Sequence, residues 1–500
     1  MPSSRFSRRN LVKAVGTLAG GSLLCQTVAC KQPAMSRPED AAVQIGGHAD
    51  YSLTIAVKPV ELASNRIIST TTFNGQFPGP LLRFKEYQQV TIDINNQTDT
   101  PEQLHWHGQF LSADVDGAAE EGTPFIPAHG SRRVTFVPKP SGYRFYHTHV
   151  RAGANLSAGQ YTGLVGPVYI EPKNNAGNYD REVFLTLKEF EPVYSRGGDM
   201  AMNFLLPEPT AKELKDSGEN AMKALLAKGM PHGFEVGYGS FTINGRMLGS
   251  GEPLRVKQGE RVLFHILNGS ATEIRSLALP GHTFTVVAMA GNPILRPVTV
   301  PGLWLGTAER ISAIVEMNHP GIWIMGDMTD DDRQHGMGTV IEYASQKGKP
   351  QWVAPKPFKW NYTQFGNQGA TVPEPDQVIE MTFAKQNAAE GGFNRWTIND
   401  VAFAEDRMHP MFRVKQGKRY RLRMRNASDD IHPVHLHRHS FELTRVAGQP
   451  TQGIIKDVVM VGGYQEVEID FVADNPGPTL FHCHQQLHMD FGFMALFEYI

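Results

Sequence analysis

The chain has 500 residues, of which 41% are hydrophobic and 20% charged, which is an ordinary globular composition. A chain of this length is too long for one hydrophobic core. Lys and Arg (48) nearly balance Asp and Glu (50), so no charge excess points to nucleic acid or to an anionic membrane surface as a partner. We therefore expect two to four domains, and the function has to be inferred from clusters of reactive side chains.

Residues 1–30 are typical of an export signal. Ser7-Arg8-Arg9-Asn10-Leu11-Val12-Lys13 precedes a Gly/Ala/Leu stretch that is too short and too weakly apolar to be a transmembrane span. The segment resembles a twin-arginine (Tat) signal, with an ordinary basic signal peptide as the alternative. Thr27-Val28-Ala29-Cys30 is either a cleavage site or an imperfect lipoprotein box, which leaves a lipid anchor at Cys30 open. We expect a periplasmic or cell-envelope location.

Only one cysteine belongs to the expected mature protein. Cys25 and Cys30 lie in or at the end of the signal, so Cys483 remains alone and cannot form an internal disulfide. A lone cysteine is commonly a buried apolar residue. The histidines on both sides of Cys483 argue against that interpretation.

Three segments of the chain share one β pattern. Phe73-Asn74-Gly75, Phe241-Thr242-Ile243-Asn244-Gly245 and Trp396-Thr397-Ile398-Asn399 are each followed by a short strand, a polar turn and a second strand. Alternating strands with Gly and Pro turns are typical of β-sandwiches. The pattern predicts an all-β chain with domains at 45–172, 180–348 and 375–500. The helical segment 210–228 is an insertion in the second domain, where it is expected to line a substrate approach.

Eleven of the 19 histidines fall into four windows of the first and third domains. The windows are His105-Trp106-His107-Gly108, His147-Thr148-His149, His432-Pro433-Val434-His435-Leu436-His437-Arg438-His439 and His482-Cys483-His484-Gln485-Gln486-Leu487-His488. Residues two apart in a strand project from the same face, so each His-x-His pair directs two imidazoles to one place. Four pairs supply eight imidazoles, more than one metal ion needs, and predict a cluster of about three ions.

Cys483 indicates which metal is bound. Its side chain is expected on the strand face opposite His482 and His484, where His432 and His488 can join it. A His₂Cys set is the blue-copper arrangement. A few covalent bonds then connect the thiolate to two cluster ligands, which provides an electron path between the two sites.

On these motifs the chain resembles the three-domain multicopper oxidases of the bacterial laccase-like kind. The family motifs H-W-H-G, H-x-H, H-P-x-H-x-H and H-C-H-x3-H are all present with unbroken spacing. The resemblance implies three consecutive cupredoxin-like Greek-key β-sandwich domains, four copper ions and the reduction of dioxygen to water. It implies type 1 ligands His432, Cys483 and His488, type 2 ligands His105 and His435, and type 3 ligands His107, His147, His149, His437, His482 and His484.

The second domain is expected to be a copper-free spacer. Met325-Gly326-Asp327 stands where the third domain has His482-Cys483-His484. We expect structural rather than ligand roles for the remaining histidines considered, which are His265, His282, His335 and His439.

The chain departs from the family pattern at the axial type 1 position. Family members with a thioether ligand have Met ten residues after the Cys, but here Phe493 stands there, with Met494 one step later. Phe493 cannot coordinate, so we expect a raised type 1 potential and a strong oxidant. Ligation by Met494 after a one-residue shift is the competing interpretation.

Dioxygen reduction also needs protons, and therefore a carboxylate near the cluster. Asp116, eleven residues after His105, matches the family's proton-relay aspartate, and Asp114 is expected to be a solvated neighbour. Met489 occupies the place of the family's second relay acid, which leaves that relay open. For Asp429 and Asp430, just before His432, turn solvation is favoured over contact with His432 or with a phenol.

The sequence favours phenols or aromatic amines as the reducing substrate, because no dense Met cluster indicates a cuprous site. A metal-ion oxidase for Cu(I), Mn(II) or Fe(II) is the main alternative, suggested by Met200, Met202, Met222 and Met230 around the inserted helix; these residues are also explained by packing. A non-catalytic cell-envelope protein is a third hypothesis, but such a protein should have lost copper ligands.

Overall fold

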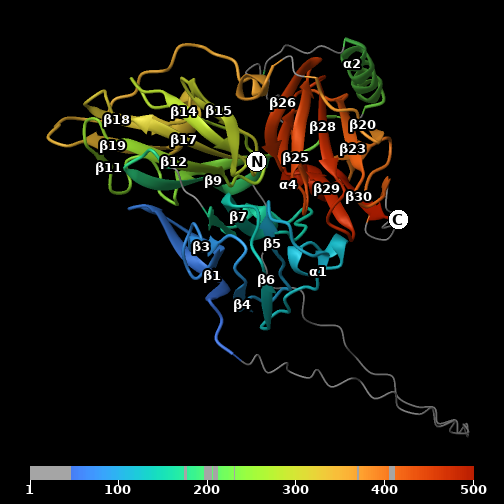
Figure 1. Ribbon diagram of the computed structural model, residues 1–500, viewed down its shortest axis with the longest axis horizontal. Helices are drawn as coiled ribbons and strands as arrows, with labels where there is room; N and C mark the ends of the chain where they lie inside the picture. Colours follow the sequence, from blue (N-terminus) through green and yellow to red (C-terminus); the bar gives the residue numbers. More distant parts are fainter. Residues whose placement is uncertain are drawn as a thin grey trace, which may run out of the picture. The chain divides into compact units, whose positions relative to one another are not determined.

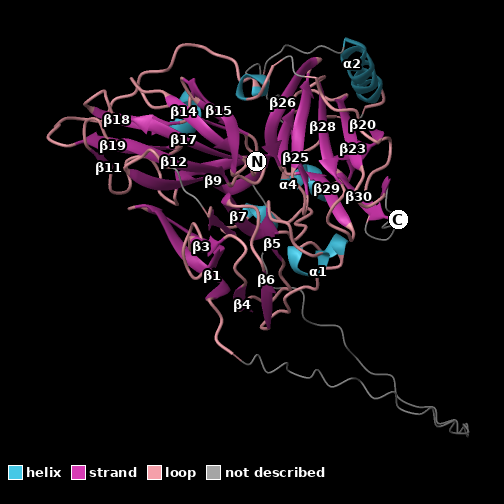
Figure 2. Cartoon of the chain, in the orientation of Figure 1, coloured by secondary structure: helices cyan, strands magenta, loops and turns pink. Residues whose placement is uncertain are grey.

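The computed structural model describes residues 47–173, 177–195, 205, 212–229, 231–368, 371–404 and 412–500. Strands predominate, as Figure 1 and Figure 2 show, and residues His48–Ile500 form one unit. The expected export signal with Cys30, and Met200, Met202 and Met230, lie outside the described residues. Among the described residues, no helix is both long enough and apolar enough to cross a membrane.

The first β-sandwich contains two four-stranded sheets. Its elements are β1 (Tyr51–Ala63), β2 (Arg66–Phe73), β3 (Leu82–Lys85), β4 (Val90–Asn96), β5 (Leu104–His107), α1 (Ala113–Asp116), η1 (Ala119–Glu121), β6 (Ser131–Phe136), β7 (Gly142–Thr148), η2 (Gly159–Tyr161) and β8 (Val165–Glu171). The strand orders are β2-β1-β4-β6 and β3-β8-β7-β5. Trp106, on the face of β5 opposite its two histidines, is completely buried in the cluster that fills this sandwich.

The second sandwich pairs a six-stranded sheet with smaller ones. Its elements are β9 (Arg181–Ser195), α2 (Lys212–Ala227), β10 (Glu235–Ile243), β11 (Leu254–Val256), β12 (Arg261–Asn268), β13 (Arg275–Leu277), β14 (Phe284–Met289), β15 (Asn292–Val300), β16 (Leu303–Leu305), β17 (Arg310–Glu316), β18 (Ile322–Gly326), α3 (Asp330–Gln334) and β19 (Gly338–Tyr343). The strand orders are β10-β9-β12-β17-β14-β15, β11-β19-β18 and β13-β16.

The third sandwich repeats the large sheet of the second. Its elements are η3 (Tyr362–Phe365), β20 (Gln377–Glu390), β21 (Phe393–Ile398), β22 (Phe412–Val414), β23 (Arg419–Asn426), β24 (His432–Leu436), β25 (Phe441–Val446), β26 (Gln449–Lys456), β27 (Val458–Val461), β28 (Glu466–Val472), β29 (Thr479–Cys483), α4 (Gln486–Asp490) and β30 (Met494–Tyr499). The order β21-β20-β23-β28-β25-β26 matches the second sandwich strand for strand, and β9/β12 and β20/β23 are both parallel. The other sheet has the order β22-β30-β29-β24-β27.

The same tight turn recurs in all three sandwiches. Its two central residues are Asn74–Gly75, Asn244–Gly245 and Asn399–Asp400, all with φ between 50° and 75°. Two consecutive positive φ angles define a type I′ turn, whose twist matches that of the flanking strands. Each asparagine Oδ1 also accepts a hydrogen bond from the backbone N–H of a threonine, at 2.6–2.8 Å. The Asn in the repeated pattern is therefore both a turn residue and a link back to an earlier strand, β1, β9 or β20.

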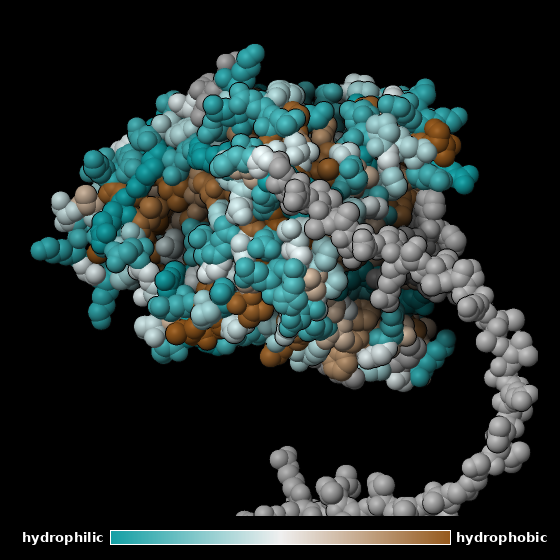
Figure 3. Space-filling model, turned by 90° about the horizontal axis from the view of Figure 1, so that it is seen from below, coloured by the Kyte–Doolittle hydropathy of each residue, from teal (hydrophilic) through white to brown (hydrophobic). Residues whose placement is uncertain are grey.

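Apolar packing joins the three sandwiches. One buried cluster runs through the second and third sandwiches, and a smaller one combines residues of all three, including Tyr143, Leu267 and Val458. On the face shown in Figure 3, hydrophilic residues predominate and apolar residues occur in separate patches. The inserted helix α2 lies beside β20 of the third sandwich (Figure 1), so a segment of the second sandwich covers part of the third.

Candidate metal centre

The four histidine motifs lie on two pairs of antiparallel strands. In the first sandwich β5 pairs with β7, and His105 is directly opposite His147. In the third, β24 pairs with β29, and His435 is directly opposite His482. The two strand pairs face each other, since the rings of His107 and His435 stack at 3.8 Å and those of His105 and His437 at 4.1 Å.

The eight imidazoles of the four His-x-His pairs are buried, none being more than 3% exposed. Their nitrogens form three sets, two of which share His107, and within each set all ligand atoms lie within 4.8 Å of one another: His107, His147 and His484; His149, His437 and His482; and His105, His107 and His435. Each set draws on both the first and the third sandwich. The centre therefore exists only where these two sandwiches meet.

Hydrogen bonds fix which ring nitrogen carries the proton. The Nδ1 atoms of His147, His435 and His482 lie 2.6–2.8 Å from the carbonyl oxygens of Thr148, Asp457 and Cys483. A carbonyl only accepts, so Nδ1 donates and Nε2 keeps its lone pair. Burial lowers the pKa of each of these three imidazoles, in His482 to about 3, so the rings are neutral.

The arrangement of these lone pairs fits metal ions better than a hydrogen-bonded core. Within the described residues, Nε2 of His105, His147 and His435 has no hydrogen-bond partner. Nε2 of His437 lies 3.0 Å from Nε2 of His482, although His437 donates from Nδ1 to Asp116 and both Nε2 atoms hold lone pairs. Two lone pairs this close repel unless a cation lies between them, and neutral imidazole is a suitable ligand for copper.

A second donor set lies on the opposite face of β29. His432, Cys483 and His488 place Nδ1, Sγ and Nδ1 at the corners of a triangle with sides of 3.2, 3.6 and 3.7 Å. The point equidistant from the three atoms lies about 2 Å from each, close to the bond lengths of a metal to imidazole and thiolate. Burial raises the pKa of the Cys483 thiol, so a thiolate here needs a cation.

Phe493 belongs to the same packed cluster as Cys483, and its ring centroid lies 4.7 Å from that of His432. Met494 packs in a different cluster, with Leu480, Met489 and others. Phe493, which directly precedes β30, and Met494, its first residue, therefore pack on different sides, and the thioether lies away from the His₂Cys set.

Two buried carboxyl groups lie beside the imidazole centre. Asp116 Oδ2 is 2.8 Å from His437 Nδ1 and 3.1 Å from His105 Nδ1, whereas Asp114 is exposed. Glu121, which the sequence did not single out, accepts a hydrogen bond from the Leu480 N–H. Burial and the neighbouring Asp116 raise the pKa of Glu121 well above its usual value. This carboxyl pair can hold a proton within reach of the imidazoles.

A cluster of charged side chains lies next to the same imidazoles. Asp457 receives two hydrogen bonds from Arg310, at 2.7 and 2.6 Å, and a longer one from Arg144, at 3.4 Å. Burial opposes ionisation, but the two guanidinium groups outweigh it and lower the pKa of Asp457 to about 2. Its carbonyl oxygen orients His435, and the three charged residues come from three different sandwiches.

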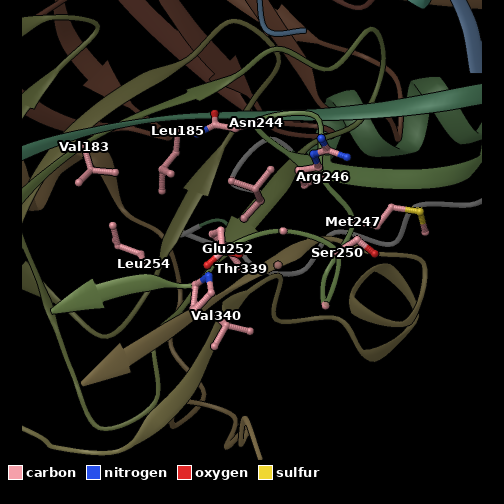
Figure 4. A pocket seen from close by; sticks show the side chains of 15 residues that line it. Val183, Leu185, Asn244, Arg246, Met247, Ser250, Glu252, Leu254, Thr339 and Val340 are labelled. Carbon is pink, nitrogen blue, oxygen red and sulfur yellow. The ribbon is translucent and has the colours of Figure 1, made fainter. Parts of the chain in front are cut away.

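The other histidines have partners of ordinary structural kind. His439 forms hydrogen bonds with the His437 carbonyl and the Tyr499 hydroxyl. His282 forms hydrogen bonds with the Pro280 carbonyl and the Tyr343 hydroxyl. His265, His282 and His335 belong to none of the candidate metal-binding groups found among the described residues. A pocket of about 250 Å³ in the second sandwich, lined by side chains such as Val183, Leu185 and Val340 (Figure 4), contains none of the motif histidines.

Sequence reasoning missed four residues of the site: Glu121, Arg310, Asp457 and Ser428, whose Oγ lies 2.9 Å from Nε2 of His432. Only two of them had a local signal, because Glu121 follows Asp116 by five residues and Ser428 precedes His432 by four. Asp429 and Asp430 were expected to be solvated turn residues, but both form ion pairs with Lys385, at 2.7 and 2.6 Å.

Three β-sandwiches that carry a His₂Cys set and an eight-imidazole centre define a copper-dependent oxidoreductase with oxygen as acceptor. Models of multicopper oxidase domains match residues 54–175, 211–347 and 370–499. The chain belongs to the multicopper oxidase family, and its domains are cupredoxin-like.

Among relatives, the chain is 28% identical to multicopper oxidase MmcO of Mycobacterium tuberculosis, over 99% of this chain and 97% of that protein. It is 26% identical to Laccase-4 of Thanatephorus cucumeris, over 82% of each chain. It is 27% identical to a copper resistance protein A homologue of Pseudomonas syringae, over 72% of this chain and 62% of that protein.

Solved structures show the same fold. Fet3p, described as a multicopper oxidase that functions in iron import, superposes with a TM-score of 0.71 at 19% identity, covering 90% of both chains. The laccase of Botrytis aclada superposes with a TM-score of 0.70 at 19% identity, covering 89% of this chain and 87% of that one.

Proposed function

We propose that this multicopper oxidase is of the laccase type, oxidising phenols or aromatic amines one electron at a time and reducing dioxygen to water. The observation that carries the proposal is the position of β29 between two donor sets. Cys483 faces one set, and its neighbours His482 and His484 face the other. An electron accepted on one face therefore needs to pass only a few bonds to reach the other.

The ligand roles follow the two sets. His432, Cys483 and His488 would hold type 1 copper, and His105 and His435 would hold type 2 copper. The six type 3 ligands divide into His107, His147 and His484 for one ion and His149, His437 and His482 for the other. Copper bound at these sites supplies one-electron oxidation at the first and dioxygen reduction at the second.

The protein's own residues position donors and protons. Asp116 orients His105 and His437 and, with Glu121, holds a proton beside the centre. The Asp457 carbonyl orients His435, and burial of all eight imidazoles excludes bulk water. Four protons are needed for each dioxygen, so a carboxyl pair at this position is suited to deliver them.

The proposal assigns the trinuclear half-sites to domains at 45–172 and 375–500, with 180–348 as a copper-free spacer. It also includes export to the periplasm or cell envelope by the twin-arginine-type signal, on the strength of Arg8-Arg9 and the weakly apolar stretch that follows. The single cysteine among the described residues, Cys483, agrees with a protein that does not depend on disulfides.

Metal-ion oxidation is the alternative, because relatives are named for copper resistance and Fet3p for iron import. A metal-ion substrate needs carboxylate or thioether ligands near His432 or His488. The carboxylates nearest in sequence to His432, Asp429 and Asp430, form ion pairs with Lys385. Asp490, two residues after His488, is 4% exposed and accepts hydrogen bonds from Gln486 and from the backbone of Ala152 and Gly153. Within the described residues, every candidate metal-binding group belongs to the two copper sets or to Asp116 with its histidines. These observations favour an organic donor.

A non-catalytic envelope protein is disfavoured because all eleven proposed ligands are assembled in the two sets.

The test begins by loading the purified protein with copper, which should give about four bound ions and a blue absorption band. Oxygen uptake is then compared with 2,6-dimethoxyphenol, Cu(I), Fe(II) and Mn(II) as electron donors. The proposal expects the highest kcat/KM with the phenol. Oxygen uptake with a metal ion alone would establish the alternative, and one bound ion with no oxygen uptake would exclude both.

A further inference from the structure

A lysine lies on the core-facing side of β20, where the neighbouring positions are apolar. Side chains two apart on a strand share a face, and Met381 and Phe383 on this face are completely buried. The next position on the same face is Lys385, whose side chain is only 11% exposed. The ring of Phe383 lies 6.3 Å from that of His432, so this face of β20 is directed to the His₂Cys set. Lys385 therefore places a positive charge beside that set.

Trp396 connects Lys385 with two of the proposed type 1 ligands. The two residues are directly opposite each other in the antiparallel pair of β20 and β21, which brings their side chains together on one face. Lys385 Nζ lies over the indole, 5.7 Å from its centroid. The same indole lies 4.1 Å from the ring of His488 and 4.8 Å from that of His432. Trp396 is 1% exposed, so an aromatic ring takes the place of water between the charge and the imidazoles.

Two aspartates face the lysine from the loop that leads into β24. Lys385 Nζ lies 2.7 Å from Asp429 Oδ1 and 2.6 Å from Asp430 Oδ2. Asp430 stands two residues before His432. The three charged groups together carry one net negative charge, with the cation beside the imidazoles and the anions on the loop. Glu235 also lies near this triad, but it adds no charge below about pH 8, because burial and the Asp430 charge raise its pKa to about 8.

The stability of the fold does not require this triad. Moving charges into a protein interior costs free energy that ion pairing recovers only in part, and apolar side chains at such positions commonly stabilise a fold equally well. Met381 and Phe383 show that this face of β20 accepts apolar residues. What an apolar residue at position 385 could not provide is an electric field at the His₂Cys set.

The two signs of charge act on the His₂Cys set in opposite directions. Reduction of a bound copper ion from Cu(II) to Cu(I) removes one positive charge, so a nearby cation favours Cu(I) and a nearby anion favours Cu(II). Lys385 acts on the imidazoles, because burial and then the Lys385 charge lower the pKa of His488 to about 3. Asp430 acts on the thiol, because its charge adds to the effect of burial in raising the pKa of Cys483.

We propose that Lys385 and Asp430 set the type 1 potential as an opposed pair, in which Lys385 raises it across Trp396 and Asp430 lowers it. The inference rests on the proposed function, because it takes the His₂Cys set as the type 1 copper site. The potential decides which donors can be oxidised, so these two residues determine the range of phenols that the enzyme oxidises. A full charge at about 10 Å, with an effective dielectric constant of about 20, shifts a one-electron equilibrium roughly tenfold.

The test is a redox titration of the blue band in the copper-loaded protein. Lys385→Met should shift the equilibrium about tenfold toward Cu(II), which lowers the potential by about 59 mV. Asp430→Asn should shift it about three- to tenfold toward Cu(I), since the Asp430 side chain is more exposed than that of Lys385 and its charge is screened more strongly. Lys385→Arg keeps the charge and should stay within about twofold of the wild type.

Opposite signs distinguish an electrostatic effect from structural damage. Lys385→Met and Asp430→Asn break the same ion pair, so a general loosening of the site would move both potentials in one direction. The double variant has the net charge of the wild type, and its equilibrium should return to within about threefold of the wild-type value. The matched control is Lys418→Met, which breaks an exposed ion pair with Asp376 of the same sandwich and should leave the potential unchanged.

The outcomes separate the inference from the proposed function. Potentials that move in the same direction in Lys385→Met and Asp430→Asn, or a shift below about twofold in Lys385→Met, overturn the inference and leave the proposed function standing. If Lys385→Met does not fold, Asp430→Asn decides alone, and an unchanged or lower potential in that variant overturns the inference. A copper-loaded wild type without a blue band overturns the proposed ligand assignment and the inference together.

Discussion

Arg310 and Asp457 form a doubly hydrogen-bonded ion pair in which neither side chain is exposed. Arg310 belongs to β17 of the second sandwich, and the Asp457 carbonyl orients His435 in the third. The second sandwich holds no candidate metal-binding group among the described residues, yet it fixes the position of a proposed copper ligand. Its role is therefore more than that of a spacer.

Arg310→Met should destabilise the protein by about 3–5 kcal/mol, because it leaves the Asp457 charge buried beside only the more distant Arg144. The measurement is the urea unfolding midpoint of the copper-free protein, together with the copper retained after dialysis. Asp457→Asn combined with Arg310→Met should recover part of the loss. Arg413→Met, which breaks an exposed pair with Glu498, should change stability by less than about 1 kcal/mol. Equal effects of Arg310→Met and Arg413→Met would contradict this account.

Phe493→Met should lower the type 1 potential, because a thioether at this position stabilises Cu(II) relative to Cu(I). We expect a fall of at least about 60 mV, equivalent to a tenfold change in a one-electron equilibrium. Redox titration of the blue band measures it. Met494→Leu is the control, since Met494 packs in a separate cluster and its loss should leave the potential unchanged. An unchanged or higher potential in Phe493→Met would show that this position does not tune the site.

Asp116→Asn should slow oxygen reduction about 10²- to 10⁴-fold, because its carboxylate contacts two of the proposed ligand imidazoles, where it would supply protons. Reduction of the blue band by the donor under argon should stay normal, since Asp116 lies on the other face of β29. Stopped-flow absorbance and oxygen uptake measure the two steps. The exposed neighbour substitution Asp114→Asn should alter neither. Equal losses in both steps of Asp116→Asn would indicate general damage to the fold.

Glu235 should make stability depend on pH. Burial and the nearby Asp430 raise the pKa of Glu235 to about 8, with Lys385 opposing and Asp429 adding to the shift. The folded protein keeps this carboxyl protonated, while the unfolded chain loses the proton near the ordinary glutamate pKa of 4.5. Stability from this group is therefore fully present below pH 4.5 and is lost as pH rises to about 8.

The variant Glu235→Gln should remove that loss, so its free energy of unfolding relative to the wild type should grow by about 3–4 kcal/mol between pH 5 and pH 8. Thermal unfolding of the copper-free proteins at both pH values is the measurement. Parallel curves for the two proteins would contradict the raised pKa. Asn394 Nδ2 donates a hydrogen bond to Glu235 Oε1, and the amide oxygen of Gln can accept the same hydrogen bond.

The sequence predicted the features that depend on local periodicity. Alternation along a strand places His105 with His107 and sets Cys483 opposite His482, so the two donor sets followed from spacing. The repeated turns that begin with Asn likewise indicated three sandwiches, and the helix expected at 210–228 is observed at Lys212–Ala227.

Contacts between residues far apart in the chain could not be predicted from the sequence. Arg310 and Asp457 are 147 residues apart, and neither stands in a pattern that names its partner. Asp429 was interpreted from its turn-like neighbours, whereas Lys385, 44 residues earlier, determines its surroundings. Asn387 and Ser428 line one pocket only because α2 of the second sandwich covers the third. Such relationships depend on how the sandwiches pack and not on local propensity.

Every imidazole set combines the two ends of the chain, and His149 and His482 are 333 residues apart. An ion held by both closes a loop of that length, as a covalent cross-link would. In the chain-entropy picture such a closure stabilises a fold by about 5–6 kcal/mol. In a chain whose described residues include one cysteine, the proposed copper cluster would therefore stabilise the fold as disulfides do in other proteins, and removal of copper should lower the free energy of unfolding.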